Sequence, residues 1–280
     1  MILDELLLFS VPKTSAIYRM YVEVTKDDAT DRNSEVIGEC IREMINNAYR
    51  IGLMGDIWRL SLTHLLVNSE NPYSLSCERD STAGESLTEF ALHDVAIIRR
   101  LYGVKLDGEF DFGTIFSAYD RDVFRGFMNY DQDRGRFGAY SQAVRWQLNE
   151  LSESLLNAGS DEEFLGHLTQ FYHRYGVGEL GLHKAFRVGN DGAIEPIQAI
   201  PEVSFDTLVG CEEQKRELIN NTKAFLAGMP ANNVLLYGEA GTGKSTSIKA
   251  LTNMFYEEGL RIIEIYKHQF PYISNIISKL

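Results

Sequence analysis

Cysteines are scarce in this 280-residue sequence. It contains three, Cys40, Cys77 and Cys211, which lie far apart and form no C-x-x-C pair. This spacing argues against a disulfide framework and a structural zinc site, and it favours a reducing compartment. Hydrophobic residues make up 44% and charged residues 24%, which is typical of a globular chain long enough for one large domain or two ordinary ones.

Long hydrophobic runs are missing as well. No run of about 18 apolar residues is present, so we expect no membrane-spanning helix. The first residues, MILDELLLFSV, contain Asp4 and Glu5 and no basic region, which argues against a signal peptide. The last three residues, 278–280, match the peroxisomal address Ser-Lys-Leu, but so short a match occurs easily by chance. We therefore expect a cytoplasmic protein.

Positive charge is scarce relative to negative charge. Lys and Arg number 27 against 40 Asp and Glu, which gives a net charge of −13. Residues 205–280 contain eight acidic and eight basic residues, so residues 1–204 carry the whole excess. Because this charge would repel a phosphate backbone, we expect no binding of nucleic acid.

Residues 1–175 are expected to form an acidic, mostly helical N-terminal domain. Apolar residues recur there at the spacing that places side chains on one face of a helix. The clearest runs are Ile37, Cys40, Ile41, Met44, Ile45 and Ala48; Val144, Leu148, Leu151 and Leu155; and Phe164, Leu168, Phe171, Tyr172 and Tyr175. Ser160 and Glu163 have the spacing of a capping box, in which two side chains satisfy free N–H groups at a helix start.

Aromatic residues crowd one region of this domain. They are Phe110, Phe112, Phe116, Tyr119, Phe124, Phe127, Tyr130, Phe137 and Tyr140. Their number favours packing in a core. A surface that recognises a protein partner or substrate remains open as the alternative.

The composition changes after residue 175. Residues 176–204 contain five glycines, followed by Pro196 and Pro201, and we interpret this segment as a linker.

Residues 205–280 are expected to form a second, partial domain. The pattern predicts a helix over 211–227, a strand over 233–237, a helix over 245–258 and a strand over 261–266. Strand, loop, helix and strand in this order form a βαβ unit, the start of a parallel sheet. The expected fold is thus a mostly helical domain followed by the beginning of an α/β core.

The strongest motif lies within this second domain. Residues 238–245, Gly-Glu-Ala-Gly-Thr-Gly-Lys-Ser, fit the pattern G-x-x-x-x-G-K-[ST] at every fixed position. Glycines let the backbone turn so that successive N–H groups point at one phosphate, and the next helix directs its positive end at the same anion. We expect Lys244 to contact the β- and γ-phosphates, Ser245 to bind Mg²⁺ and Thr246 to contact the α-phosphate. The predicted nucleotide-binding residues of this loop are Gly238, Glu239, Ala240, Gly241, Thr242, Gly243, Lys244, Ser245 and Thr246.

A second motif precedes this loop by about thirty residues. Phe205-Asp-Thr-Leu-Val-Gly210 resembles the entry motif of AAA+ ATPases, whose Leu-Val-Gly turn packs against adenine. By this resemblance Val209 and Gly210 join the expected nucleotide site. The whole stretch from Phe205 to Phe270 resembles an uncharacterised bacterial family of AAA+ type, the domain of unknown function 815.

This resemblance implies a P-loop NTPase core that takes ATP and Mg²⁺ as cofactors. For a longer protein it implies ATP hydrolysis that remodels a partner or substrate bound by the helical domain, and it leaves a homo-oligomer open. The residues after the strand at 261–266, KHQFPYISNIISKL, contain no acidic residue. The Walker B carboxylates, the sensor and the arginine finger therefore have no candidates there, and we expect a chain truncated within its ATPase domain. The alternative is a nucleotide-responsive binding module that does not hydrolyse ATP.

Four weaker signals are set aside. Residues 176–181 match the dinucleotide pattern G-x-G-x-x-G, but they follow an expected helix and not the strand that this fold needs. Residues 111–113 spell Asp-Phe-Gly without the other kinase motifs. The stretch that begins at Asp131 starts like a calcium-binding loop, but its glycine is at the wrong position and its last ligand position lacks the expected glutamate. His167 and His173 would lie on opposite sides of a helix.

Overall fold

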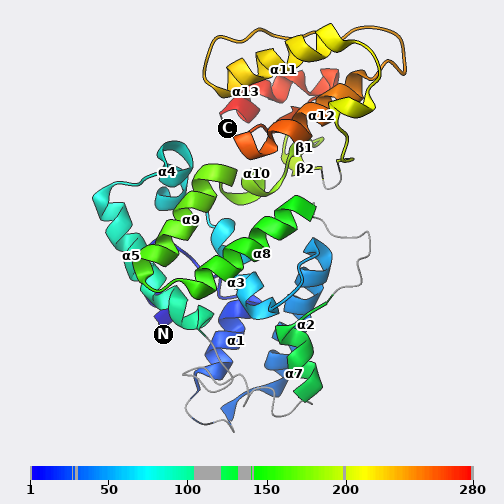
Figure 1. Ribbon diagram of the computed structural model, residues 1–280. Coiled ribbons are helices and arrows are strands. Elements are labelled where there is room, and N and C mark those ends of the chain that lie inside the picture. Colours follow the sequence, from blue (N-terminus) through cyan, green and yellow to red (C-terminus); the bar gives the residue numbers. More distant parts are fainter. Residues whose placement is uncertain are drawn as a thin grey trace. The chain divides into compact units, whose positions relative to one another are not determined.

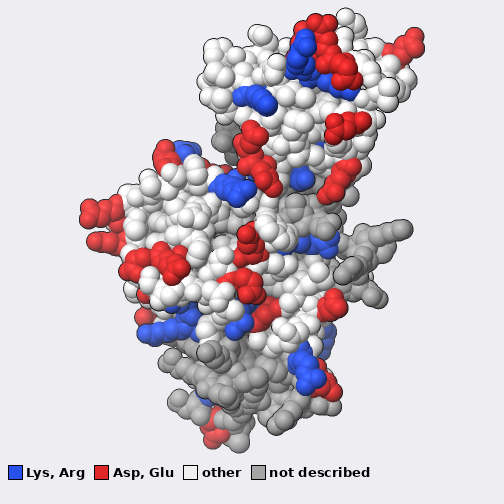
Figure 2. Space-filling model, viewed as in Figure 1, with Lys and Arg blue, Asp and Glu red and all other residues white. Residues whose placement is uncertain are grey.

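A computed structural model describes residues 2–26, 28, 31–103, 121–131, 140, 142–197 and 200–278. The chain divides into two compact units, Met1–Gly178 and Glu179–Leu280, which we call the helical unit and the C-terminal unit. In the part of the chain that is described, no helix has the length and apolar character needed to cross a membrane. Acidic side chains are spread over the visible face of the helical unit (Figure 2).

The helical unit confirms the expected helical character. Its elements are η1 (Ile2–Glu5), α1 (Ala16–Val24), α2 (Ser34–Ile51), α3 (Ile57–Val67), α4 (Pro72–Asp80), α5 (Glu85–Tyr102), α7 (Arg121–Met128), α8 (Gln142–Asn157) and α9 (Asp161–Tyr175) (Figure 1). Helix α1 packs on α2, α9 packs on α4, α5 and α8, and α3 packs on α2 and α8. Of the apolar run predicted for α2, every member but Ile45 is buried.

Helix boundaries in this unit follow from local side-chain caps. The Ser160 hydroxyl accepts a hydrogen bond from the Glu163 N–H at 3.1 Å, as the capping-box spacing predicts. The Glu163 carboxylate in turn accepts from the N–H of Gly159 at 2.7 Å, one residue before the cap. Gly52 ends α2 in the left-handed conformation, with φ of 78°, which glycine adopts without strain.

The aromatic region is described only in part. Phe127 and Tyr140 are buried, and the backbone of Tyr130 exchanges two 2.8 Å hydrogen bonds with that of Gly55. Phe127 and Tyr140 agree with the interpretation as core, whereas Tyr130 is only partly buried. Phe110, Phe112, Phe116, Tyr119 and Phe137 lie outside the described residues, as do the side chain of Phe124 and the tripeptide at 111–113.

A buried carboxylate joins the N-terminal segment to α5. Asp94 is fully buried, and its two oxygens accept hydrogen bonds from the N–H groups of Leu7, Leu8 and Phe9 at 2.8, 2.8 and 2.9 Å. Hydrogen bonds to an ionised acceptor are stronger than neutral ones. These three hydrogen bonds offset the desolvation cost of burying the Asp94 carboxylate, and they satisfy three successive backbone N–H donors.

The C-terminal unit contains helices and a small mixed sheet. Its elements are α10 (Gly178–Leu182), β1 (Ala185–Val188), β2 (Ile194–Pro196), η4 (Phe205–Thr207), α11 (Glu212–Leu226), α12 (Lys244–Phe255), η5 (Tyr256–Glu258), β3 (Ile262–Glu264), η6 (Lys267–Tyr272) and α13 (Ile273–Ile277). The strand order is β2-β1-β3, with β2 antiparallel and β3 parallel to β1. The helices predicted over 211–227 and 245–258 are present.

The structure differs from the linker that the sequence predicts over residues 176–204. This range contains α10 and two of the three strands, and Phe186 in β1 is 1% exposed. Two of its glycines form the turn between β1 and β2: the Gly189 N–H donates to Ala193 at 2.8 Å, and Gly192 has φ of 81°. Short strands joined by a glycine turn have too few residues to show a clear alternation of apolar and polar side chains.

The prediction of a buried strand over 233–237 is wrong. The structure assigns no strand there, and Leu235 and Tyr237 are 82% and 87% exposed. A strand is buried only when neighbouring strands satisfy its backbone N–H and C=O groups. Within the described ranges, β3 pairs with β1 instead. The first strand of the expected βαβ unit is therefore missing from the sheet.

We predict that Asp94→Ala lowers the free energy of unfolding of the helical unit by about 3 kcal/mol, because three backbone donors lose a charged acceptor. Both tryptophans, Trp58 and Trp146, belong to this unit, so tryptophan fluorescence during urea denaturation measures its stability. Glu89→Ala, at an exposed position of the same helix, is the control and should change little. Equal stability of the two variants would contradict this role of Asp94.

Candidate phosphate-binding site

The loop predicted to bind phosphate joins the exposed segment 231–237 to α12. Gly238, Gly241 and Gly243 have φ angles of 138°, 83° and 83°, in the region that residues with a Cβ rarely adopt. The backbone therefore makes the sharp turns for which the motif requires glycine. Glu239 and Ala240 are exposed on this loop.

Helix α12 begins at Lys244, directly after the loop. It has no side-chain cap and no acidic residue in its first turn. The Ser247 N–H donates to the Gly243 carbonyl at 2.8 Å, which closes the first turn. The N–H groups that precede Ser247 in the helix have no acceptor within it, since such groups lie at the start of every α-helix. Together with the helix dipole they make this end attractive to an anion.

The ammonium group of Lys244 lies over the loop. Its Nζ donates hydrogen bonds to the carbonyl of Gly238 at 3.0 Å, to that of Glu239 at 2.7 Å and to the Thr242 hydroxyl at 3.3 Å. The Thr242 hydroxyl donates to the Glu239 carbonyl at 2.9 Å. These contacts hold the loop in its turned form and place a fixed positive charge beside the start of α12.

Two hydroxyl groups follow Lys244 in the first turn of α12. Ser245 is exposed and Thr246 is partly buried. A serine hydroxyl is an oxygen ligand of the kind that Mg²⁺ accepts together with water and phosphate oxygens. Among the described residues, no group of three or more His, Cys, Asp or Glu side chains could hold a metal ion. Any Mg²⁺ at this loop would therefore need most of its ligands from a bound phosphate and water.

The turn at residues 208–210 lies against the same loop. Leu208 Cδ2 is 2.9 Å from the position that a Cβ on Gly243 would occupy, so Leu208 packs directly over that glycine. The Leu208 carbonyl accepts a hydrogen bond from Lys215 of α11. Val209 is fully exposed, and Gly210 has φ of 83°. The structure thus brings the two sequence motifs together and leaves Val209 accessible at the loop.

Burial of one face of α12 holds this arrangement in place. The cluster comprises Phe205, Leu218, Ala250, Leu251, Phe255 and Leu260, with Leu208 and Ile248 packed against it. The sequence indicated that Leu251 and Phe255 point inward. It did not indicate the contact between Leu208 and Gly243, because the two residues are far apart in the chain and belong to no shared pattern.

The C-terminal part of the chain matches a known family model. The family model described as "Protein of unknown function (DUF815)" matches residues 182–280. The match begins within α10, close to the start of the C-terminal unit, and it includes the loop and α12. No curated protein and no solved structure matches the chain.

We predict that Gly243→Ala destabilises the C-terminal unit more than Gly241→Ala. Both substitutions place a Cβ at a left-handed residue, which costs about 1–2 kcal/mol. At Gly243 the Cβ also meets the Cδ2 methyl of Leu208, which must shift, whereas at Gly241 nothing lies within 4 Å, so Gly243→Ala carries an additional small cost. Thermal denaturation followed by far-UV circular dichroism, with tryptophan fluorescence to identify the helical unit, measures the difference. A larger loss for Gly241→Ala would contradict the contact.

Proposed function

We propose that the chain binds ATP with Mg²⁺ through the loop at residues 238–246. The observation that carries this proposal is the backbone of the loop, in which three glycines with positive φ lead into the uncapped start of α12. A phosphate placed there would meet several N–H donors and the positive end of a helix at once. The Lys244 ammonium lies close enough to exchange its carbonyl partners for phosphate oxygens.

Each residue of the site has a distinct role in this proposal. Lys244 neutralises the β- and γ-phosphates, Ser245 supplies a ligand to Mg²⁺, and Thr246 contacts the α-phosphate. Val209 and Gly210 contact adenine, a role that rests on the resemblance to AAA+ ATPases and is supported by the position of Leu208 at Gly243. Bound Mg²⁺ would neutralise phosphate charge.

We further propose that the chain belongs to a bacterial protein of AAA+ type, and that this protein couples ATP hydrolysis to the remodelling of a partner. The helical unit would recognise that partner, and its acidic surface argues against nucleic acid in this role. Cytoplasmic location and assembly with copies of itself belong to the same proposal.

A second candidate is a nucleotide-responsive binding module. Hydrolysis needs carboxylates that orient water and a positive charge on the far side of the γ-phosphate. The residues that follow β3 contain no acidic side chain. This chain would then bind ATP and respond to it without turnover.

We predict that Lys244→Ala weakens ATP binding by about ten- to a hundredfold, because a charge-assisted contact to phosphate contributes about 1.5–3 kcal/mol. Isothermal titration calorimetry with ATP and Mg²⁺ measures the affinity. Lys249→Ala removes a second positive charge from the exposed surface of the same helix and should leave the affinity nearly unchanged. If both variants bind ATP as tightly as the original chain, the site has been assigned to the wrong residues.

We also predict that this 280-residue chain releases phosphate from ATP at a rate close to background. An arginine donated by a neighbouring subunit can alone accelerate nucleotide hydrolysis by a factor of about 10³–10⁵. The residues after β3 also include no carboxylate that could orient the attacking water. A phosphate-release assay at saturating ATP measures the rate, with Lys244→Ala as the blank. Steady turnover that Lys244→Ala abolishes would show that the chain supplies its own catalytic groups.

A further inference from the structure

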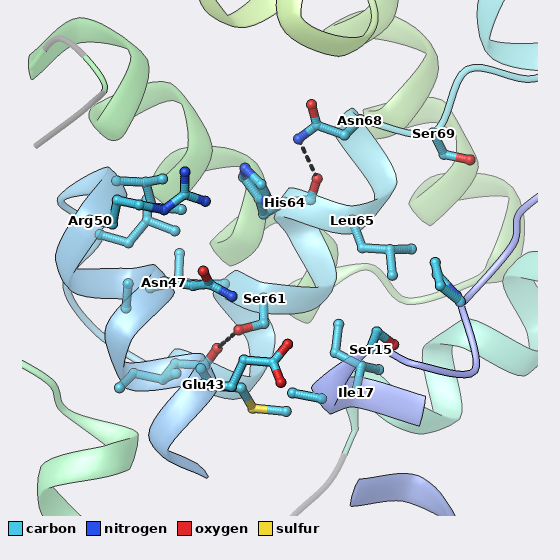
Figure 3. Close-up of a pocket in the computed structure, with 18 of the residues that line it drawn as sticks. Ser15, Ile17, Glu43, Asn47, Arg50, Ser61, His64, Leu65, Asn68 and Ser69 are labelled. Atoms are coloured by element: carbon cyan, nitrogen blue, oxygen red, sulfur yellow. Dashed lines mark hydrogen bonds between the residues drawn. The ribbon is translucent and has the colours of Figure 1, made fainter. Parts of the chain in front are cut away.

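The helical unit contains a cavity of about 550 Å³, and none of the residues that line it belongs to the proposed nucleotide site. Its walls come from residues 10–17, from α2 and from α3 together with residues 68–70 (Figure 3). Apolar side chains that line it include Ile17, Met44, Leu60 and Leu65. The volume lies within the range of about 300–1,000 Å³ that is typical of small-molecule sites.

Three polar side chains form a row along one wall. Glu43, Asn47 and Arg50 follow one another on α2 at intervals of four and three residues, which places them on one face of the helix. In Figure 3 their side chains extend from α2 toward α3, with Glu43 at one end of the cavity and Arg50 at the other. The row therefore presents a negative charge, an amide and a positive charge in sequence.

Several other polar side chains of the cavity already have hydrogen-bond partners, whereas Glu43, Asn47 and Arg50 retain free hydrogen-bonding capacity. Ser61 donates to the Ile57 carbonyl at 2.7 Å, Asn68 donates to the His64 carbonyl at 2.8 Å, and His64 pairs with the Tyr140 hydroxyl. Glu43 is paired with Arg19 through one carboxylate oxygen, Oε2. For the side chains of Asn47 and Arg50, no hydrogen bond or ion pair with another described residue is found.

We propose that this cavity binds a short peptide with free ends, two or three residues long. Its ammonium group would lie at Glu43, its backbone amide at Asn47 and its terminal carboxylate at Arg50. An apolar side chain of the peptide would contact Met44, Leu60 and Leu65. The order of the three groups on α2 matches the order of charge and amide along such a peptide.

The dimensions agree with a ligand of this length. Glu43 and Arg50 are seven residues apart, about 10.5 Å along a helix that rises 1.5 Å per residue. An extended peptide spans at most about 3.3–3.6 Å per residue, so three residues cover nearly the same distance. The flexible side chains of Glu43 and Arg50 can adjust to two residues. A ligand with a single charge would use one end of the row only.

The test is calorimetric titration of the full chain with the tripeptide Ala-Leu-Ala and with its end-blocked forms. Blocking either end, by N-acetylation or C-amidation, should weaken binding by about tenfold or more, because each removes one charge-assisted contact. Arg50→Gln should weaken binding of the free tripeptide to the same extent. Arg50→Gln should change the affinity for the amidated tripeptide by no more than about twofold relative to the original chain, since that ligand no longer offers a charge to Arg50.

Matched controls separate this site from general electrostatic effects. Arg42→Gln removes the same charge from an exposed position of α2 outside the cavity and should leave every affinity unchanged. A longer peptide that contains Ala-Leu-Ala internally and is itself blocked at both ends should bind no better than the doubly blocked tripeptide. Absence of binding by the original chain, equal affinity for free and doubly blocked tripeptide, or an equal loss in Arg42→Gln would each overturn the proposal.

Discussion

The candidate nucleotide site depends on the burial of one face of α12. Leu251 and Phe255 pack against Phe205 in the core of the C-terminal unit, and this burial fixes the axis of the helix. Its first turn is therefore held directly after the loop, where Leu208 closes over Gly243. This placement of the helix is needed for the glycine conformations, the uncapped helix start and the Lys244 contacts. The loop is therefore preorganised for the proposed ligand.

Charge is arranged differently in the two proposed sites. Residues 205–280 have no net charge, and the proposed attraction for phosphate there would come from backbone N–H groups, a helix dipole and Lys244. The excess negative charge belongs to residues 1–204. Within that region Arg50 offers a local positive charge at one end of a cavity and Glu43 a negative charge at the other. Recognition at both proposed sites would therefore depend on the positions of a few groups, and the net charge of each region would have little influence.

The sequence predicted the helices well because their signals are local. Apolar spacing and side-chain caps such as Ser160 depend on neighbours within a turn or two, and the positive φ of the loop follows from its glycines. The sheet was predicted poorly, since a strand is defined by its partners. Residues 185–188 looked like a linker and became the central strand, whereas Leu235 looked buried and is exposed. The contact of Leu208 with Gly243 and the cavity at Asn47 join distant segments, and no sequence pattern indicated either of them.

Hydrogen exchange of the intact chain, measured with ATP and Mg²⁺ and separately with adenosine, tests whether the loop at residues 238–246 binds the phosphates of a nucleotide. We expect ATP to slow exchange of the backbone N–H groups at residues 239–246 and also at residues 208–210. Adenosine, which has no phosphate to occupy the loop, should protect residues 239–246 little. Unchanged exchange in the loop with ATP, or equal protection by adenosine, would contradict the claim that this loop binds the phosphates of a nucleotide.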